Sequence, residues 1–149
     1  MKIYIGADYG AIDLKLKVID YLKSLSHEVI DVTENASDVN DYPIIAFAVG
    51  EAVRDNEGSF GIAICKSGQG MCVAANKVKR VRCIRAATPE DAFLGRDHDS
   101  ANVLSLGSEV TTDFEMVKKI LDAFFNTPNP TLDRRLKRIE LLNKYEDEN

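Results

Sequence analysis

The sequence predicts one three-layer α/β/α domain, in which a five-stranded parallel sheet lies between helices and a further helix follows at the C-terminus. Three observations lead to this fold class. The length of 149 residues is typical of a single domain, which we place at 1–149. Short apolar segments alternate with longer amphipathic segments along the chain, and glycine, proline or aspartate separates most of them.

The predicted strands are short segments rich in isoleucine, valine and other apolar residues. FGIAIC at 60–65 is almost unbroken in its apolar character, as expected of a parallel strand that helices cover on both faces. KIYIGA at 2–7 is similar and ends just before the polar Asp8. The five predicted strands cover residues 2–7, 28–32, 60–65, 81–86 and 102–107.

The predicted helices alternate with these strands and place apolar residues at near-helical spacing. A polar loop over 35–43 ends at Pro43, and Pro128 and Pro130 separate the last two helices. This alternation calls for right-handed crossovers, and it predicts ligand binding at the edge where the strands end, here called the carboxyl edge. The predicted helices cover about residues 11–25, 44–56, 70–78, 89–96, 113–126 and 132–146.

The composition excludes several classes of protein. No apolar run approaches the roughly 20 residues that cross a bilayer, and residues 1–7 are too short for a signal peptide, so we expect a cytoplasmic protein without membrane contact. A net charge of −5 disfavours nucleic acid as a partner. Three cysteines without a CxxC pair argue against disulfides and a cysteine zinc site, so Cys72 and Cys83 are predicted core residues.

The segment CKSGQGM at 65–71 follows a predicted strand and precedes a helix. Ser67 is the predicted N-cap of that helix, and Gly68 and Gly70 leave backbone N–H groups open to an anion. The pattern is neither a Walker loop nor GxGxxG. Glycine spacing alone fits an ordinary strand-to-helix turn as well as it fits an anion hole.

Cys65 favours the functional interpretation through its position. A thiol at a strand end, beside a helix N-terminus and next to Lys66, should have a pKa below the roughly 8.5 of a free thiol. Thiolate would then be available near neutral pH as a general base. The alternative is a buried structural cysteine, which is the commoner fate of this residue type.

His98 and an arginine pair are the other candidates for chemistry. His98 follows the predicted helix at 89–96, and we expect it at the carboxyl edge, where it could transfer a proton; the alternative is a capping or surface histidine. Arg134 and Arg138 share one helical face at i, i+4 and could bind a phosphate. The alternative for this pair is a solvated charge run.

Together these segments resemble the ribose-5-phosphate isomerase B family, which also includes the galactose-6-phosphate isomerase subunits. The resemblance covers nearly the whole chain, and its motifs are GADYG, DYP at 41–43, CKSGQGM followed by AANK, RDHDSANVLSLGS and the basic C-terminal helix. It implies a Rossmann-like (flavodoxin-like) sheet and a homodimer, or a dimer of such dimers, with active sites at the subunit interface. It implies no metal or organic cofactor.

The resemblance also implies roles for residues of this chain. Cys65 would be the base that moves a proton from C2 toward C1 of an open-chain sugar phosphate through a cis-enediolate. Ser67 would act on the sugar oxygens, and His98 would assist ring opening. Arg134 and Arg138 would contact the phosphate from the neighbouring subunit. The other implied substrate-binding residues are Asp8, Tyr9, Lys66, Gly68, Gln69, Gly70, Met71 and Asp99.

Four positions depart from the family pattern. Tyr9 stands where the family usually has histidine, Lys66 replaces the glycine of CGTG, and Glu109 stands where the ribose enzymes often have arginine. The C-terminal GGRHxxR appears as LDRRLKR at 132–138, which keeps the arginines and lacks the histidine. We therefore expect that the proton-transfer chemistry is kept and that the specificity has changed.

The leading hypothesis is an aldose–ketose isomerase of the ribose 5-phosphate type. One alternative is a hexose-6-phosphate isomerase of the galactose or allose type. Another is a sugar-phosphate-binding protein with weak or no turnover, which Tyr9, Lys66 and Glu109 motivate, or a subunit of a hetero-oligomer.

Overall fold

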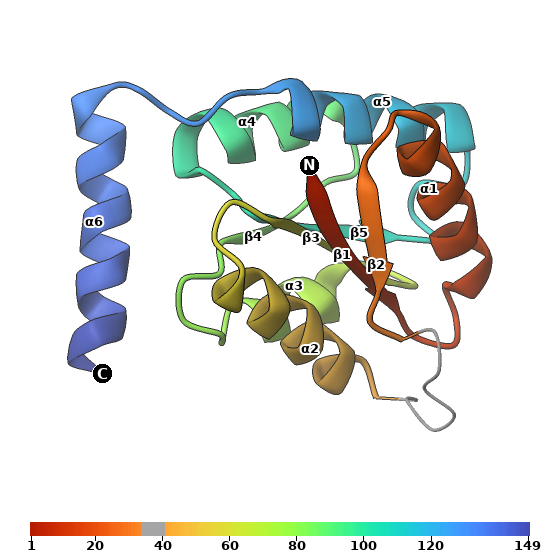
Figure 1. The fold of residues 1–149 in the computed structure, drawn as a ribbon, viewed down its shortest axis with the longest axis horizontal. Helices are drawn as coiled ribbons and strands as arrows, with labels where there is room; N and C mark the ends of the chain where they lie inside the picture. The colour runs from red at the N-terminus through yellow and green to blue at the C-terminus, as the bar shows by residue number, and fades with distance from the viewer. Residues whose placement is uncertain (34–40) are drawn as a thin grey trace.

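The computed structural model describes residues 1–33 and 41–149. All five predicted strands are present, and they pair in parallel in the order β2-β1-β3-β5-β4 (Figure 1). Most of the predicted polar loop at 35–43 lies outside the described residues. The strands are β1 (Lys2–Ala7), β2 (Glu28–Asp31), β3 (Phe60–Cys65), β4 (Cys83–Arg85) and β5 (Val103–Gly107).

In the described residues, helices cover both faces of this sheet (Figure 1). Helices α1, α4 and α5 pack on one face, and α2 and α3 pack on the other. The predicted three-layer α/β/α class is therefore confirmed. The helices are α1 (Ile12–Ser24), α2 (Tyr42–Asp55), α3 (Gln69–Ala75), α4 (Pro89–Asp99), α5 (Phe114–Asn126) and α6 (Asp133–Glu148).

Alternation along β3 explains the two apolar cores. Ile62 and Ile64 belong to the core beneath α1, α4 and α5, whereas Ala63 and Cys65 belong to the core beneath α2 and α3. Successive side chains of a strand point to opposite faces, so a strand that helices cover on both sides is apolar throughout. The thiol of Cys65 is thereby directed to the face that carries α3.

The strand order differs from the flavodoxin order 2-1-3-4-5 in its last two strands. After β3 the chain forms the three-residue β4 as the outermost strand of the sheet. Strand β5 then pairs between β3 and β4. As a result Gly107, at the end of β5, pairs with Cys65 at the end of β3. This order places the β5–α5 connection against the CKSGQGM segment.

Helix α4 is longer than predicted. The prediction ends it at Arg96, but α4 continues to Asp99 and ends where Ser100 adopts a left-handed φ of 51°. Asn102 then accepts a hydrogen bond through its carbonyl from the N–H of Gly61, at the start of β3, at 2.9 Å. The end of α4 therefore lies at the edge where the strands begin, here called the amino edge.

Helix α6 stands beside the main body of the chain (Figure 1), and none of its residues is buried. Ion pairs connect it to the rest: Arg135 binds Asp97 at 2.6 Å, and Arg80 binds Glu146 at 3.1 Å. Across the described residues, no helix combines the length and apolar character needed to cross a membrane. The exposed apolar side chains of α6 are Leu136, Leu141, Leu142 and Tyr145.

Candidate active site

Cys65 lies at the centre of the carboxyl edge. It ends β3, and β1 beside it leads to the opposite half of the sheet, so the two strands form the switch point at which open parallel sheets bind ligands. Cys65 is 6% exposed, and its sulfur accepts a hydrogen bond from the Gly68 N–H at 3.2 Å. This contact stabilises negative charge on the sulfur. The expected thiolate at Cys65 stays a prediction.

The turn after Cys65 depends on Gly68. Its φ of 79° is left-handed, and a Cβ there would lie 3.0 Å from the backbone carbonyl carbon of Leu106, so another residue would strain the turn. Gly68, and not the predicted Ser67, is the N-cap of α3. The Ser67 hydroxyl instead accepts a hydrogen bond from the Gln69 N–H at 3.2 Å. Ser67 is exposed, which leaves its hydroxyl accessible to a ligand.

Two residues that sequence reasoning did not single out hold this turn in place. The buried Ser105 hydroxyl donates to the Gly68 carbonyl at 2.6 Å, and the Arg85 Nε donates to the Ser67 carbonyl at 2.9 Å. No sequence motif marks either residue, because they come from β5 and β4 and only the strand order brings them beside the turn. Hydrogen bonds from Ser105 and Arg85 to two carbonyl groups of the turn therefore hold it in place.

The first turn of α3 follows directly. The N–H groups of Gly70 and Met71 belong to a helix start, where no carbonyl within the helix accepts them. The Met71 side chain is fully buried, so this residue offers only its backbone to a ligand. A Cβ on Gly70 would lie 2.7 Å from the ring of Tyr42, which places this aromatic side chain beside the site. Tyr42 was not predicted as a site residue, although it lies in the DYP motif.

Asp8, Tyr9 and Gly10 lie next to Cys65, because the Asp8 N–H donates to the Ile64 carbonyl at 3.1 Å. Burial raises the pKa of Asp8, against the lowering effects of the Gly10 N–H and the Lys66 charge. The Lys66 ammonium lies 5.3 Å from the centre of the exposed Tyr9 ring, a cation–π contact. The stem of Lys66 packs against Gly10, where a Cβ would lie 2.7 Å from it.

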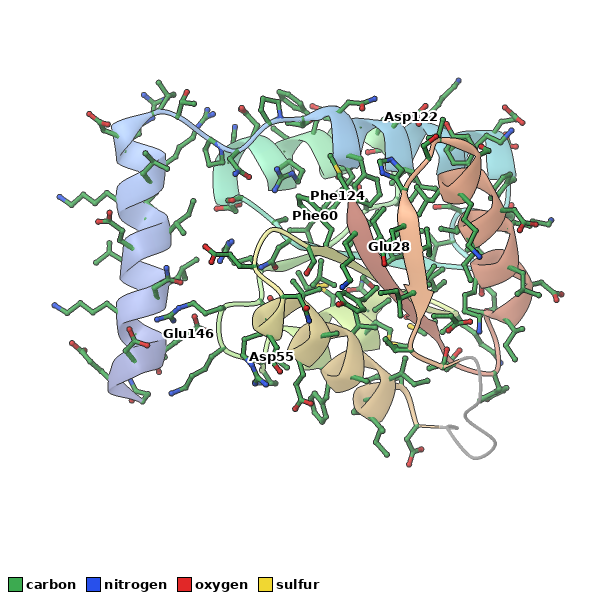
Figure 2. All side chains as sticks on the ribbon, viewed as in Figure 1. Glu28, Asp55, Phe60, Asp122, Phe124 and Glu146 are labelled. Carbon is green, nitrogen blue, oxygen red and sulfur yellow. The ribbon has the colours of Figure 1, made fainter. Side chains whose placement is uncertain are left out.

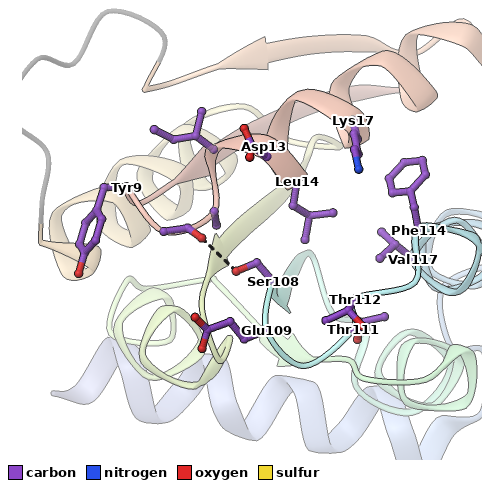
Figure 3. A pocket seen from close by; sticks show the side chains of 13 residues that line it. Tyr9, Asp13, Leu14, Lys17, Ser108, Glu109, Thr111, Thr112, Phe114 and Val117 are labelled. Carbon is purple, nitrogen blue, oxygen red and sulfur yellow. Dashed lines mark hydrogen bonds between the residues drawn. The ribbon is translucent and has the colours of Figure 1, made fainter.

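A cavity of about 560 Å³ opens between this segment and the β5–α5 connection (Figure 3). The Ser108 hydroxyl donates to the Gly10 carbonyl at 3.1 Å and joins the two walls. Tyr9 and Glu109 both line the cavity, together with the cationic Lys17 of α1. Two of the positions that depart from the family pattern therefore share one cavity beside the Cys65 turn.

Within one chain, His98 and Asp99 lie at the edge of the sheet opposite Cys65. The expectation that His98 lies at the carboxyl edge is wrong, because α4 runs back along the sheet and carries its last turn to the amino edge. The exposed His98 ring lies 3.7 Å from the Asp97 carboxylate, which also binds Arg135 of α6 at 2.6 Å. The ring-opening role of His98 stays a prediction.

Arg134 and Arg138 are exposed on α6, beside the end of α4. The first turn of α6 is tied to Asp97 near the amino edge, so both arginines also lie away from Cys65 of their own chain. Their expected contact with a phosphate group stays a prediction.

The other two cysteines lie beneath the site. Cys83 is buried, as predicted, whereas Cys72 is only half-buried. The Asn76 side chain accepts from the Cys83 N–H at 2.8 Å and donates to the Cys72 carbonyl at 3.0 Å, so the asparagine of AANK links α3 to β4. Over residues 1–33 and 41–149, no three His, Cys, Asp or Glu side chains come together as a possible metal site.

Comparison with known proteins assigns this architecture to a family. The Ribose/Galactose Isomerase family model matches residues 3–142. Ribose-5-phosphate isomerase B of Mycobacterium tuberculosis is 37% identical over 147 residues, which cover 98% of this chain and 90% of that protein. The chain belongs to the ribose/galactose isomerase family.

Two further proteins that are similar to this chain are informative. The crystal structure of ribose-5-phosphate isomerase B from Mycoplasma genitalium with bound ribulose-5-phosphate has a TM-score of 0.91 at 37% identity and covers 99% of this chain and 97% of that one. D-erythrulose-4-phosphate isomerase of Pectobacterium atrosepticum is 35% identical over 127 residues, 85% of this chain and 83% of that protein. The prediction of a sugar-phosphate aldose–ketose isomerase is thereby confirmed at the level of the family.

The raised pKa of Asp8 predicts a pH-dependent effect on stability. Because burial penalises the carboxylate, ionised Asp8 lowers the free energy of unfolding, and this loss develops as the pH rises above the unfolded-state pKa of 3.8 and through the higher folded-state pKa. Asp8→Asn should therefore be more stable than the parent at neutral pH, and the difference should vanish below 3.8. Urea denaturation of the parent and of Asp8→Asn, from below pH 3.8 to neutral pH, measures the free energy of unfolding of each protein.

Asp20→Asn is the matched control, since Asp20 is an exposed carboxylate on α1. It should leave the free energy of unfolding near the parent value across the range. An Asp8→Asn protein less stable than the parent at neutral pH would contradict the burial argument.

Proposed function

We propose that this chain interconverts the aldose and ketose forms of a sugar phosphate of the ribose 5-phosphate type, with Cys65 as the base. The observation that carries the proposal is the contact between the Cys65 sulfur and the turn that follows it. One short segment supplies a group that can accept a proton and backbone N–H groups that can bind an oxyanion. These two functions must be adjacent. When one carbon loses its proton, negative charge develops on the carbonyl oxygen of the neighbouring carbon.

The reaction moves two protons and leaves the overall composition of the sugar unchanged. Cys65 removes the hydrogen of C2, and the N–H groups of the turn stabilise the resulting enediolate oxygen. The Cys65 thiol then returns the proton to C1. The Ser67 hydroxyl, which is exposed beside the turn, transfers the remaining proton between the two sugar oxygens.

Two copies of the chain would complete this site. His98, Arg134 and Arg138 are exposed and lie away from Cys65 in their own chain, so a second copy can present them to the carboxyl edge. Helix α6 supports such packing, because four of its apolar side chains are exposed and none of its residues is buried. We therefore propose a homodimer with shared active sites, which could pair further into a dimer of dimers.

The cytoplasm is the proposed location of this enzyme. The three cysteines, including the base, are free thiols. A thiol base must stay reduced to accept a proton, and the cytoplasm keeps thiols in that state.

Removal of the thiol should abolish proton transfer. With ribose 5-phosphate in deuterated water, the parent should exchange the C2 hydrogen with solvent, and Cys65→Ala should lower isomerisation and exchange by about 10²–10⁴-fold, the contribution of a general base. Proton NMR follows both processes in one sample.

Cys72→Ala is the matched control, because it removes another thiol of the same chain without touching the turn. It should stay within a few-fold of the parent. Exchange by Cys65→Ala at the parent rate would eliminate Cys65 as the base. Tight binding without exchange for every pentose, hexose and tetrose phosphate would instead favour the sugar-phosphate-binding alternative.

The shared site predicts complementation between two inactive variants. Cys65→Ala and His98→Ala should each be nearly inactive, but a mixed dimer holds one site with an intact Cys65 and an intact His98. Random exchange of subunits should then restore about a quarter of the parent activity per chain, because half of the dimers are mixed and each has one working site. Activity is measured after co-refolding equal amounts of the two variants. A sum of the separate activities would contradict a shared site.

A shorter substrate, such as a four-carbon ketose phosphate, is the second candidate, and Lys66 favours it. The Lys66 stem packs on Gly10 and its ammonium lies over Tyr9, so the side chain narrows the region between Cys65 and the adjacent cavity. A cation on the residue next to the base would bind a phosphate close to the reacting carbons. The D-erythrulose-4-phosphate isomerase relative has a substrate of this length in its name.

Substitution of Lys66 tests which substrate the site prefers. Lys66→Gly should lower kcat/KM for a tetrulose 4-phosphate by at least about tenfold, because a charge-assisted phosphate contact is lost, and should favour ribose 5-phosphate in relative terms. Lys66→Met keeps an unbranched apolar side chain and removes the charge. It therefore distinguishes the steric effect of the Lys66 side chain from its binding of phosphate. An unchanged preference in both variants would leave ribose 5-phosphate as the better proposal.

A further inference from the structure

A second cavity, of about 530 Å³, lies at the amino edge of the sheet, on the side opposite Cys65. The loops before β3, β4 and β5 and the connection from α5 to α6 form its walls. Figure 2 labels Phe60, which lines the cavity, together with Asp55 of α2 and Glu146 of α6. Four arginines line the cavity: Arg54, Arg80, Arg82 and Arg96. This concentration of positive charge is unexpected in a chain with a net charge of −5.

The two outer arginines are neutralised by carboxylates. Arg54 binds Asp55 at 2.8 Å, and Arg80 binds Glu146 at 3.1 Å and Asp147 at 2.6 Å. These pairs account for their charges without a ligand.

The inner arginine Arg96 is different. It is 4% exposed, and its guanidinium donates to the Ala101 carbonyl at 2.7 Å, the Thr127 carbonyl at 3.3 Å and the Asn129 side-chain oxygen at 2.8 Å. These neutral acceptors fix the position of the guanidinium and leave its charge uncompensated. In the part of the chain that the structure describes, no carboxylate lies within ion-pair distance of Arg96.

Arg82 likewise forms no ion pair among the described residues. Its Nε donates to the Ser100 carbonyl at 2.9 Å and one terminal nitrogen approaches the Arg80 carbonyl at 3.5 Å. Glu57, the acidic residue in the cavity wall, pairs with neither inner arginine. Arg82 therefore keeps N–H groups for another acceptor.

The electrostatics of the two inner side chains agree with this description. Burial lowers the pKa of Arg96, and the neighbouring charge of Arg82 lowers it further. Burial also lowers the pKa of Arg82; Arg80 adds to that effect, whereas Glu146 and Asp99 oppose it. Two like charges thus lie near each other in a partly buried cavity, an arrangement that costs stability unless an anion is present.

We propose that this arginine-lined cavity binds the phosphate group of a small phosphorylated metabolite, at a site separate from the Cys65 turn. Guanidinium groups that are fixed in position present paired N–H donors that match phosphate oxygens. The ring of Phe60, 4.9 Å from the Arg96 guanidinium carbon, stacks on one side of that group and helps to fix its plane. Arg82 supplies the unsatisfied donors.

The substitution Asn129→Asp tests the proposal directly, because it places a carboxylate where the amide oxygen now lies 2.8 Å from Arg96. Without phosphate, the variant should unfold at a higher temperature than the parent, since the built-in anion compensates the arginines. Inorganic phosphate should raise the unfolding temperature of the parent and should raise that of the variant much less. A variant with the parent Tm and the full phosphate response would overturn the proposal.

Calorimetric titration with inorganic phosphate separates this cavity from the proposed catalytic site. Arg134→Gln/Arg138→Gln, in which the proposed catalytic phosphate contacts are removed, should still bind phosphate. Arg82→Gln should lose at least about tenfold in affinity at the cavity, and circular dichroism checks its fold. Because binding is measured without turnover, the result does not depend on the proposed isomerase. Phosphate binding that disappears in the double variant and persists in Arg82→Gln would assign all of it to the catalytic site and overturn the proposal.

Discussion

The candidate site depends on the close approach of the end of β5 to the turn after Cys65. A Cβ on Gly107 would lie 2.6 Å from the Ser67 carbonyl group, so only glycine permits this contact. The parallel ladder also continues beyond the strands, because the Ser108 N–H donates to the Cys65 carbonyl at 2.9 Å and the Glu109 N–H donates to the Lys66 carbonyl at 2.9 Å. The base, the turn and one wall of the adjacent cavity are thereby fixed relative to one another.

Local features of the sequence could predict the elements and the position of the base, but they could not predict the strand order. The apolar run of β3 and the glycines after it place Cys65 at a strand end whatever the neighbours of that strand are. The exchange of β4 and β5 depends on how two crossovers pack, which no single residue marks. Arg85 and Ser105, which hold the turn, could for this reason be found only in the structure.

The prediction that His98 lies at the carboxyl edge was wrong for a different reason. In a parallel sheet every crossover helix returns the chain to the amino edge, so a residue in the last turn of α4 cannot lie beside the end of β3 of the same chain. The alternation of strands and helices along the sequence was therefore sufficient to predict His98 at the amino edge. The consequence is chemical as well as geometric, since a thiol and an imidazole at opposite edges can act on one substrate only if two chains combine.

Helix α6 connects the two proposals, because charge and not burial holds it to its own chain. Partly exposed ion pairs such as that of Arg80 with Glu146 stabilise a contact only modestly, so packing against a partner can decide where the helix lies. Arg80 also lines the arginine cavity, and Glu146 acts on the charge of Arg82. A phosphate bound to Arg82 would add a second negative charge to a guanidinium that the Glu146 carboxylate of α6 already attracts. If phosphate binds there, occupancy of the cavity would be coupled to the position of α6, which carries the arginines proposed to reach a partner's substrate.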